Sequence, residues 1–382
     1  MPDIAQTIAV AAPAERVYAA LTTRCAATLR RIGACMLRTS RVAARLPALV
    51  ALLASALAFG CTAPLAAEPA DDGLVAARAT LSAARAMLLA HLAAAKTHSD
   101  DAYDIVYRLN AAAEALDGAR ARAEPEYARD RELAAELDAT WVRAVTSGLC
   151  EAPAAAGGAS ETCFRATSDG TLQPLALYVP SGIERTPPVV IVLRGRGQTE
   201  SDLLARHELR TLADGAHAIL IAPYARGRAT YDGAATQDVF DALATVEQAR
   251  AVDRTRVYVA GFSMGGIAAF HVAGVAPQRF AAVLSIVGAL DGVDREPLRA
   301  FAGRAAYVVN GESDAIIAPA HGRAAARYLR SIGVLARYYE QPHGAHDLRS
   351  MLPALSAAWH DMFAGITAAS HATTVFDNED VF

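Results

Sequence analysis

Residues 256–266 read Arg-Val-Tyr-Val-Ala-Gly-Phe-Ser-Met-Gly-Gly, and this stretch decides the fold. Its apolar start predicts a buried strand, and the residues after it, Ile267 to Val275, predict a helix. Between them lies a G-x-S-x-G pattern, the spacing of a strained turn that exposes a serine oxygen above a sheet. Glycines are required there because a Cβ atom on either side of the serine would clash in so tight a turn. The stretch therefore predicts a nucleophilic serine, Ser263, in place of an ordinary glycine-rich turn.

A nucleophilic serine needs a histidine base, and the base needs an acid that orients it. In chains with this turn the acid follows the serine and the histidine comes last. Residues 305–309 predict a buried strand that runs into Glu312 and Asp314. Asp314 is the predicted acid because of its position just past the strand end, and Glu312 is the competing candidate.

The predicted base lies after the next strand, 336–340, where two histidines compete. His346 stands at the junction between this loop and a predicted closing helix, 348–363, whereas His343 directly follows Pro342. The junction is the more usual position for a base, so we predict His346. The other histidines do not have metal-ligand spacing with cysteines or acids, and no metal site is predicted.

A serine of this kind also needs two N–H donors for the oxyanion. One is expected from Met264, the residue after the nucleophile. The second is expected from the loop 194–198, Arg-Gly-Arg-Gly-Gln, which follows a predicted strand at 189–193. Arg196, between the two glycines, is the candidate donor. The loop lacks both the G-K-[ST] ending of a P-loop and the G-x-G-x-x-G spacing, so phosphate binding is not predicted.

Residues 163–364 resemble an α/β-hydrolase catalytic domain. Within that superfamily, 253–266 and 276–282 resemble the esterase branch of feruloyl esterases, polyhydroxybutyrate depolymerases and related carboxylesterases or peptidases. The resemblance implies an α/β fold with a mostly parallel central sheet and flanking helices. It also implies a cofactor-free hydrolase whose triad positions match Ser263, Asp314 and His346.

One residue departs from this resemblance. The family usually has His-Gly after the strand that precedes the oxyanion loop, and this chain has Arg194-Gly195. The family's histidine supports the loop, so Arg194 is expected to change the loop's geometry or to bind an anionic group. Gln198, Tyr224 and Tyr231 are predicted substrate contacts, but the sequence does not identify the ester.

Composition restricts the class of protein. The chain has 382 residues, of which 53% are hydrophobic, so it can hold one large core and a smaller second unit. Its net charge of −4 is too mild to indicate nucleic-acid binding.

The N-terminal part predicts export. Residues 36–67 have a basic start, an apolar run at 46–59 and a Gly60-Cys61 pair, which together approximate a lipoprotein signal. Cleavage near 63–67 without lipidation and a retained anchor helix are the alternatives. A periplasmic or outer-membrane lipoprotein, or a secreted protein, is therefore expected, with Cys61 as the membrane anchor. Residues 1–35 are predicted to be an extraneous extension, although their first 22 or so resemble the start of START-like ligand-binding domains.

The segment 74–147 is rich in alanine and predicts three helices in a bundle or hairpin, without a catalytic signature. Residues 148–162 predict a linker, and 365–382 a disordered tail. Cys150 and Cys163 are expected to form a disulfide if the protein is exported, which would close a loop of about 14 residues.

Three functions remain open. An exported serine ester hydrolase is the leading prediction. A serine peptidase on the same triad is the second. The third is a non-catalytic envelope protein that binds or scaffolds through its helices. Oligomeric state cannot be predicted from the sequence.

Overall fold

A computed structural model describes residues 72–95, 106, 108–117, 124–152, 157–226 and 230–367. The chain divides into two units, and the described residues belong to the second, Asp71–Phe382. The predictions for the extension 1–35 and the export segment with Cys61 lie outside the described residues. The same is true of the predicted tail after Thr367. We call residues 72–147 the helical region and residues 157–367 the sheet region.

One eight-stranded sheet organises the sheet region. Its order is β1-β2-β4-β3-β5-β6-β7-β8. The pairs β1–β2 and β2–β4 are antiparallel, and the other neighbours are parallel. The central strands are apolar along their whole length because helices cover both faces of a parallel sheet. The strands are β1 (Gly158–Arg165), β2 (Leu172–Val179), β3 (Val189–Leu193), β4 (Ile219–Pro223), β5 (Val257–Phe262), β6 (Ala282–Ile286), β7 (Ala305–Gly311) and β8 (Leu335–Gln341).

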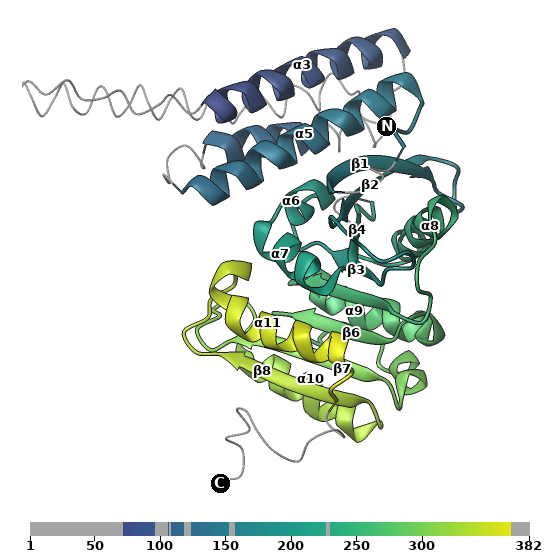
Figure 1. Cartoon of the computed structure of the whole chain (residues 1–382), viewed down its shortest axis with the longest axis vertical. Coiled ribbons are helices and arrows are strands. Elements are labelled where there is room, and N and C mark those ends of the chain that lie inside the picture. The colour runs from purple at the N-terminus through teal and green to yellow at the C-terminus, as the bar shows by residue number, and fades with distance from the viewer. Residues whose placement is uncertain are drawn as a thin grey trace, which may run out of the picture. The chain divides into compact units, whose positions relative to one another are not determined.

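Helices cover both faces of this sheet (Figure 1). One buried cluster joins the sheet to α8 (Ala234–Ala249), α9 (Met264–Val275) and α10 (Pro319–Ser331). A second cluster, on the other face, includes α6 (Glu200–Leu204), α7 (His207–Ala216) and α11 (Leu348–Ala364). Two short 3-10 helices, Pro277–Arg279 and Pro297–Phe301, complete the elements. The predicted fold class, a mostly parallel sheet with flanking helices after a helical region, is confirmed.

The helical region contains α3 (Asp72–Ala95), a helical segment at 108–117 and α5 (Pro125–Ser147). Helices α3 and α5 lie side by side (Figure 1). Leu81 and Leu88 of α3 share a buried cluster with Ala135 and Val142 of α5. By length and composition alone, Gly73–Leu92 is apolar enough to cross a membrane, with a mean hydropathy of 1.3. Core helices also meet that criterion, and the contacts of α3 with α5 give this helix a packed face.

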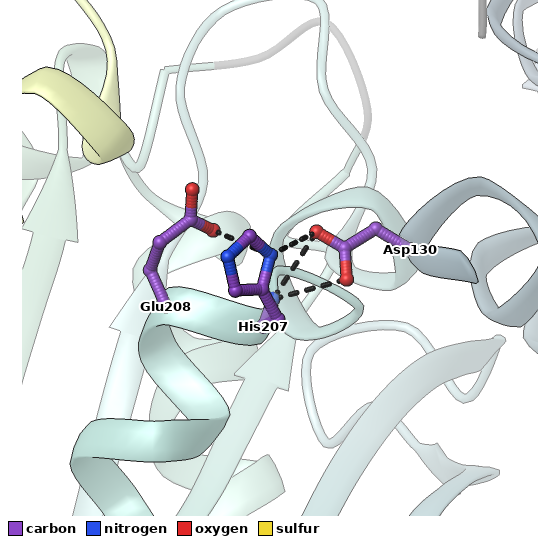
Figure 2. A group of neighbouring side chains, drawn as sticks. All are labelled: Asp130, His207 and Glu208. Atoms are coloured by element: carbon purple, nitrogen blue, oxygen red, sulfur yellow. Dashed lines mark hydrogen bonds and ion pairs between the residues drawn. The ribbon is translucent and has the colours of Figure 1, made fainter. Parts of the chain in front are cut away.

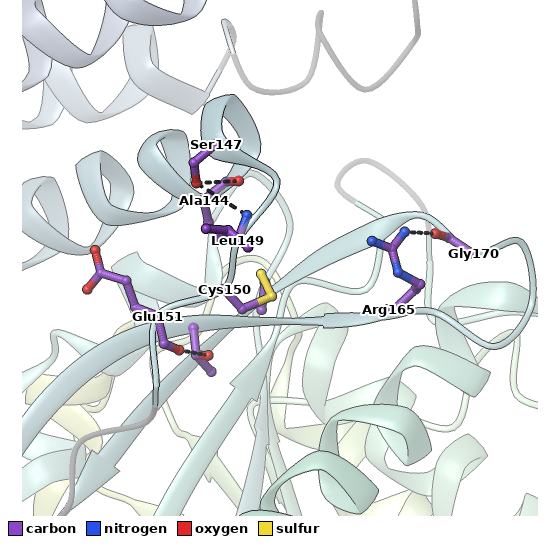
Figure 3. The surroundings of a disulfide bond; sticks show 9 residues. Ala144, Ser147, Leu149, Cys150, Glu151, Arg165 and Gly170 are labelled. Carbon is purple, nitrogen blue, oxygen red and sulfur yellow. Dashed lines mark hydrogen bonds between the residues drawn. A yellow bond between two sulfur atoms is a disulfide. The ribbon is translucent and has the colours of Figure 1, made fainter.

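The helical and sheet regions meet within the segment that was predicted to be a linker. Helix α5 ends at Ser147, and the capping residue after it, Gly148, has a φ of 73°, the left-handed conformation that glycine adopts readily. Cys150 then forms the predicted disulfide with Cys163 on β1 (Figure 3). β1 already begins at Gly158, so the segment 148–162 is partly strand. The disulfide and the strand together attach α5 to the edge of the sheet.

A buried charge cluster also lies between the two regions. We define it as Arg108 and Asp138 of the helical region with Glu161 and Glu200 of the sheet region; each is at most 2% exposed. Both Glu161 carboxyl oxygens lack a hydrogen-bond partner among the described residues. Burial raises the pKa of Glu161 well above its ordinary value, and the nearby Glu200 carboxylate raises it further. Glu161 is therefore most compatible with the fold when it is protonated.

We expect Glu161→Gln to stabilise the protein at pH 8. A raised pKa means that the wild type is most stable below the ordinary glutamate value of about 4.5 and loses stability as the pH rises through the folded-state value. Glutamine copies the neutral form, so it removes a penalty of about 1–3 kcal/mol at high pH. Thermal unfolding at pH 5 and pH 8 tests this. An equal effect at both pH values, or destabilisation at pH 8, would contradict it.

Candidate active site

Ser263 lies in the tight turn between β5 and α9. Its backbone has φ 55° and ψ −116°, a strained conformation for a residue with a side chain. The Ser263 N–H donates to the carbonyl of Ile286 at 2.9 Å, which fixes the turn to β6. The glycines on both sides are required by space, because a Cβ atom on Gly261 would collide with the Gly265 carbonyl. One on Gly265 would collide with the Leu193 carbonyl.

The predicted acid and base lie beside this serine. His346 Nε2 is 2.8 Å from Ser263 Oγ, and His346 Nδ1 is 2.7 Å from Asp314 Oδ2. The other carboxylate oxygen of Asp314 accepts the N–H groups of Ile316 and Ile317, at 2.8 and 2.9 Å. The Asp314 side chain is fully buried, whereas that of His346 is 13% exposed. A hydrogen-bonded chain thus runs from a fixed carboxylate to a hydroxyl that faces a pocket.

The three side chains follow β5, β7 and β8, at the carboxyl ends of parallel strands. Serine, acid and histidine occur in this order along the chain, and the serine stands on a strand–turn–helix elbow. The sheet region has the α/β-hydrolase fold.

The competing candidates for acid and base, Glu312 and His343, lie away from Ser263. Glu312 Oε2 accepts the backbone N–H of His343 at 2.9 Å, where His343 has a positive φ of 59°. The His343 side chain is 93% exposed. This pair therefore holds the turn that leads to His346 and does not contact Ser263.

The loop 194–199 is built as a compact turn beside Ser263. The Gly195 N–H donates to Gln198 Oε1 at 2.9 Å, and the Gln198 N–H donates back to the Gly195 carbonyl at 3.3 Å. Arg196, at the tip, is exposed and lines the same pocket as Ser263 and Met264. Met264 is the first residue of α9, where a backbone N–H has no partner within the helix. Both predicted oxyanion donors thus belong to residues at the pocket.

Arg194 supports this loop from inside the protein. It is 2% exposed, and its Nε donates to the Tyr224 carbonyl at 2.9 Å. Its backbone N–H donates to the Tyr231 hydroxyl at 2.8 Å. Burial raises the pKa of Tyr231 to about 12, so its hydroxyl stays protonated. Arg194 does not line the described pocket, which favours a supporting role over the binding of an anionic group.

The pocket above Ser263 has a volume of about 410 Å³. Of the three predicted substrate contacts, Tyr231 lines it, whereas Gln198 and Tyr224 make the internal contacts described above. The lining residues are Arg196, Thr230, Tyr231, Asp232, Ser263, Met264, Ile267, Ala268, His271, Asp291, Gly292, Val293, Ile316 and Ile317.

Sequence reasoning missed one face of α9. Met264, Ile267, Ala268 and His271 all line the pocket, at positions i, i+3, i+4 and i+7. That spacing places them on one side of a helix. His271 Nε2 lies 3.1 Å from Thr236 Oγ1, so it is held at the pocket wall. Counting helical turns from the nucleophile would have found this histidine.

Another group, Asp130, His207 and Glu208, combines residue types that can bind a metal (Figure 2). Its carboxylates are already paired, because Arg206 donates to Glu208 at 2.7 Å and Arg210 donates to Asp130 at 3.0 Å. His207 also donates its backbone N–H to Asp130 at 3.1 Å. This group is therefore better explained as an ionic contact between α5 and α7.

Part of the sheet region is similar to known proteins. Residues 224–296, which include Ser263, match the prolyl oligopeptidase family (Peptidase_S9). The bifunctional acetylxylan esterase/xylanase XynS20E of Neocallimastix patriciarum is 27% identical over 117 residues, 30% of this chain. The match covers only 17% of that relative's length.

Solved structures of esterases are also similar to this chain. A thermostable esterase is 21% identical, with a TM-score of 0.46 over 54% of this chain and 62% of its own. A ferulic acid esterase is 17% identical, with a TM-score of 0.45 over 54% of this chain and 98% of its own. The fluorophosphonate-binding serine hydrolase FphF of Staphylococcus aureus is 16% identical, with a TM-score of 0.46 over 55% of this chain and 99% of its own.

Proposed function

We propose that the chain is a serine carboxylic ester hydrolase with Ser263, His346 and Asp314 as its catalytic triad. The observation that carries this proposal is the hydrogen-bonded chain from Asp314 Oδ2 through both ring nitrogens of His346 to Ser263 Oγ, with distances of 2.7 and 2.8 Å. Nucleophile and base within hydrogen-bond reach, with the base held by a third group, is the arrangement that activates a serine.

In the first half-reaction, His346 Nε2 takes the Ser263 proton as Oγ forms a bond to the ester carbonyl carbon. Asp314 holds the Nδ1–H tautomer and stabilises the imidazolium. The carbonyl oxygen becomes an oxyanion, which the N–H groups of Met264 and Arg196 stabilise. When the intermediate collapses, the C–O bond to the alcohol breaks and His346 returns its proton to the leaving oxygen.

The acyl-enzyme is then hydrolysed. Water enters the position that the alcohol has left, and His346 removes one of its protons as the water oxygen attacks the acyl carbon. Collapse of the second intermediate breaks the bond to Ser263 Oγ, which regains a proton from His346. The acid product leaves and the resting enzyme returns. No cofactor is required for either step.

The substrate class is an ester whose acyl or alcohol part fits a pocket of about 410 Å³ with apolar and polar walls. The names of similar proteins point to acetylated polysaccharides and ferulic acid esters. These are the first substrates to test. Arg196, Asp232 and Asp291 supply charges of both signs at the pocket.

A serine peptidase is the second candidate, and the match of residues 224–296 to the prolyl oligopeptidase family favours it. The test compares initial rates on p-nitrophenyl acetate and on peptide p-nitroanilides, together with fluorophosphonate labelling mapped to a peptide. Ester cleavage with labelling at Ser263 supports the esterase. Amide cleavage at comparable rates would replace it with the peptidase, and a folded protein without labelling would favour a binding protein.

We also propose that the protein is exported and attached to a membrane through Cys61. The Cys150–Cys163 disulfide supports an oxidising compartment. Fractionation of cells that express the full chain and a Cys61→Ala variant tests both parts. A cytoplasmic full chain would contradict export, and an equally membrane-bound variant would contradict the lipid anchor.

A further inference from the structure

Arg108 connects the helical region to the residues that follow the loop 194–199. It is 1% exposed, and its Nε donates to Asp138 of α5 at 2.6 Å. On the other side it pairs with Glu200 and donates to Ser201 Oγ at 2.8 Å. Glu200 and Ser201 open α6, immediately after the loop. One arginine therefore attaches the end of this loop to the helical region.

The same guanidinium also reaches the loop's beginning through an aromatic ring. The Arg108 guanidinium carbon lies 5.1 Å from the centroid of the Tyr224 ring, and that of Arg194 lies 5.0 Å from the same centroid. Both distances are within the range of cation–π attraction, which is stronger at desolvated sites. The Tyr224 ring thus connects the buried cation of the helical region with the one that begins the loop.

Arg194 connects the Tyr224 ring to the loop beside Ser263. Its NH1 donates to the Gly195 carbonyl at 3.3 Å. Gly195 in turn bonds Gln198 across the turn that presents Arg196 to the pocket. A continuous set of contacts therefore runs from the helical region to the loop beside the nucleophile.

Stability alone does not account for this construction. Burying an arginine among carboxylates carries a desolvation penalty, and a well-packed apolar group is often as stable or more stable. Burial lowers the pKa of Arg108, but Glu200, Asp138 and the other carboxylates outweigh it and keep the guanidinium charged. The planar guanidinium has five donors in fixed directions, so what it adds is orientation.

We propose that the helical region positions the oxyanion donor of loop 194–199, with Arg108 and Tyr224 as its positioning residues. The proposal rests on the proposed function. An oxyanion donor must lie about 2.7–3.1 Å from the developing charge, so small displacements lower the rate. Neither Arg108 nor Tyr224 lines the described pocket, and each acts through the loop.

The first experiment compares Tyr224→Leu with Tyr224→Phe. Leucine removes the ring, and kcat on p-nitrophenyl acetate is expected to fall about 10- to 100-fold with KM within a factor of about three. Phenylalanine keeps the ring and is expected to restore kcat to within a factor of about three. If Tyr224 contacted substrate instead, KM would rise with little change in kcat, and that result would overturn the proposal.

The second experiment replaces the ion pairs as a unit, Arg108→Met with Asp138→Asn and Glu200→Gln, so that neither buried carboxylate is left without its arginine. The matched control is Arg210→Met, which breaks the ionic contact with Asp130 between the same two regions, away from the loop. We expect the triple variant to lose about 10- to 100-fold in kcat, and the control to keep kcat within about twofold.

Melting temperatures of the two proteins distinguish a positioning role of Arg108 from a general loss of stability. The proposal is overturned if kcat is unchanged in the triple variant. It is also overturned if kcat falls in both the triple variant and Arg210→Met in proportion to their loss of melting temperature. An inactive wild type that fluorophosphonate does not label would instead contradict the proposed function. An active wild type with unaffected variants contradicts only the positioning role.

Discussion

Ser263→Ala is expected to abolish ester hydrolysis, with kcat lower by about 10⁵- to 10⁶-fold. The only hydroxyl within 2.8 Å of His346 Nε2 among the described hydrogen bonds is lost, so the base has no nucleophile to activate. Alanine has the same Cβ as serine and fits the same positive φ, so stability should change little. Initial rates with p-nitrophenyl acetate and fluorophosphonate labelling measure the effect.

The control for this variant is the wild type labelled in the same preparation and mapped to the peptide that carries Ser263. Circular dichroism on both proteins verifies folding. If folded Ser263→Ala kept more than about a hundredth of wild-type activity, another nucleophile would be acting and the triad would be wrong.

Asp314→Asn is expected to lower kcat by about 10⁴-fold while leaving the fold intact. Asp314 Oδ1 accepts two backbone N–H groups, so an asparagine must turn its carbonyl oxygen toward them. Its NH2 then faces His346 Nδ1, which can only accept. That hydrogen bond selects the tautomer with a proton on Nε2, and His346 can no longer take the proton of Ser263.

A second carboxylate provides the control for this prediction. Glu312→Gln changes the competing acid, which binds the backbone of His343, and should keep kcat within about threefold. A loss in Glu312→Gln as large as that in Asp314→Asn would reverse the assignment of the acid.

The sequence predicted the strands and the tight turn around Ser263 well, because local geometry dictates the residue types there. The elbow requires glycines around Ser263, and the strands that carry the acid and base are continuous apolar runs, so their ends could be located. Strand β7 and helix α11 differ from their predicted bounds by only one or two residues. This agreement has a physical cause. Parallel strands that are buried on both faces are continuous apolar runs in the sequence, so their ends are easy to locate.

The contacts behind the site could not be predicted in the same way. Arg108 and Glu161 are charged residues, and a charged residue in a sequence usually indicates a solvated surface. Their burial depends on partners 30 or more residues away, such as Arg108 with Asp138 and Glu200. Similarly, β1 forms because it pairs with β2, and its Ala- and Gly-containing start resembles a linker until that pairing is known.

The buried charge cluster also limits how freely the helical region and the sheet region can be exchanged between proteins. In a tandem arrangement joined by a free linker, evolution or an engineer can exchange one part and keep the other. Here, cutting the chain before Gly158 would leave Glu161 and Glu200 in the sheet region without Arg108 and would expose the sheet edge that α5 covers. The helical region and the sheet region are therefore expected to be inherited together. A helical region transplanted from a relative would have to carry an arginine that matches Glu161 and Glu200.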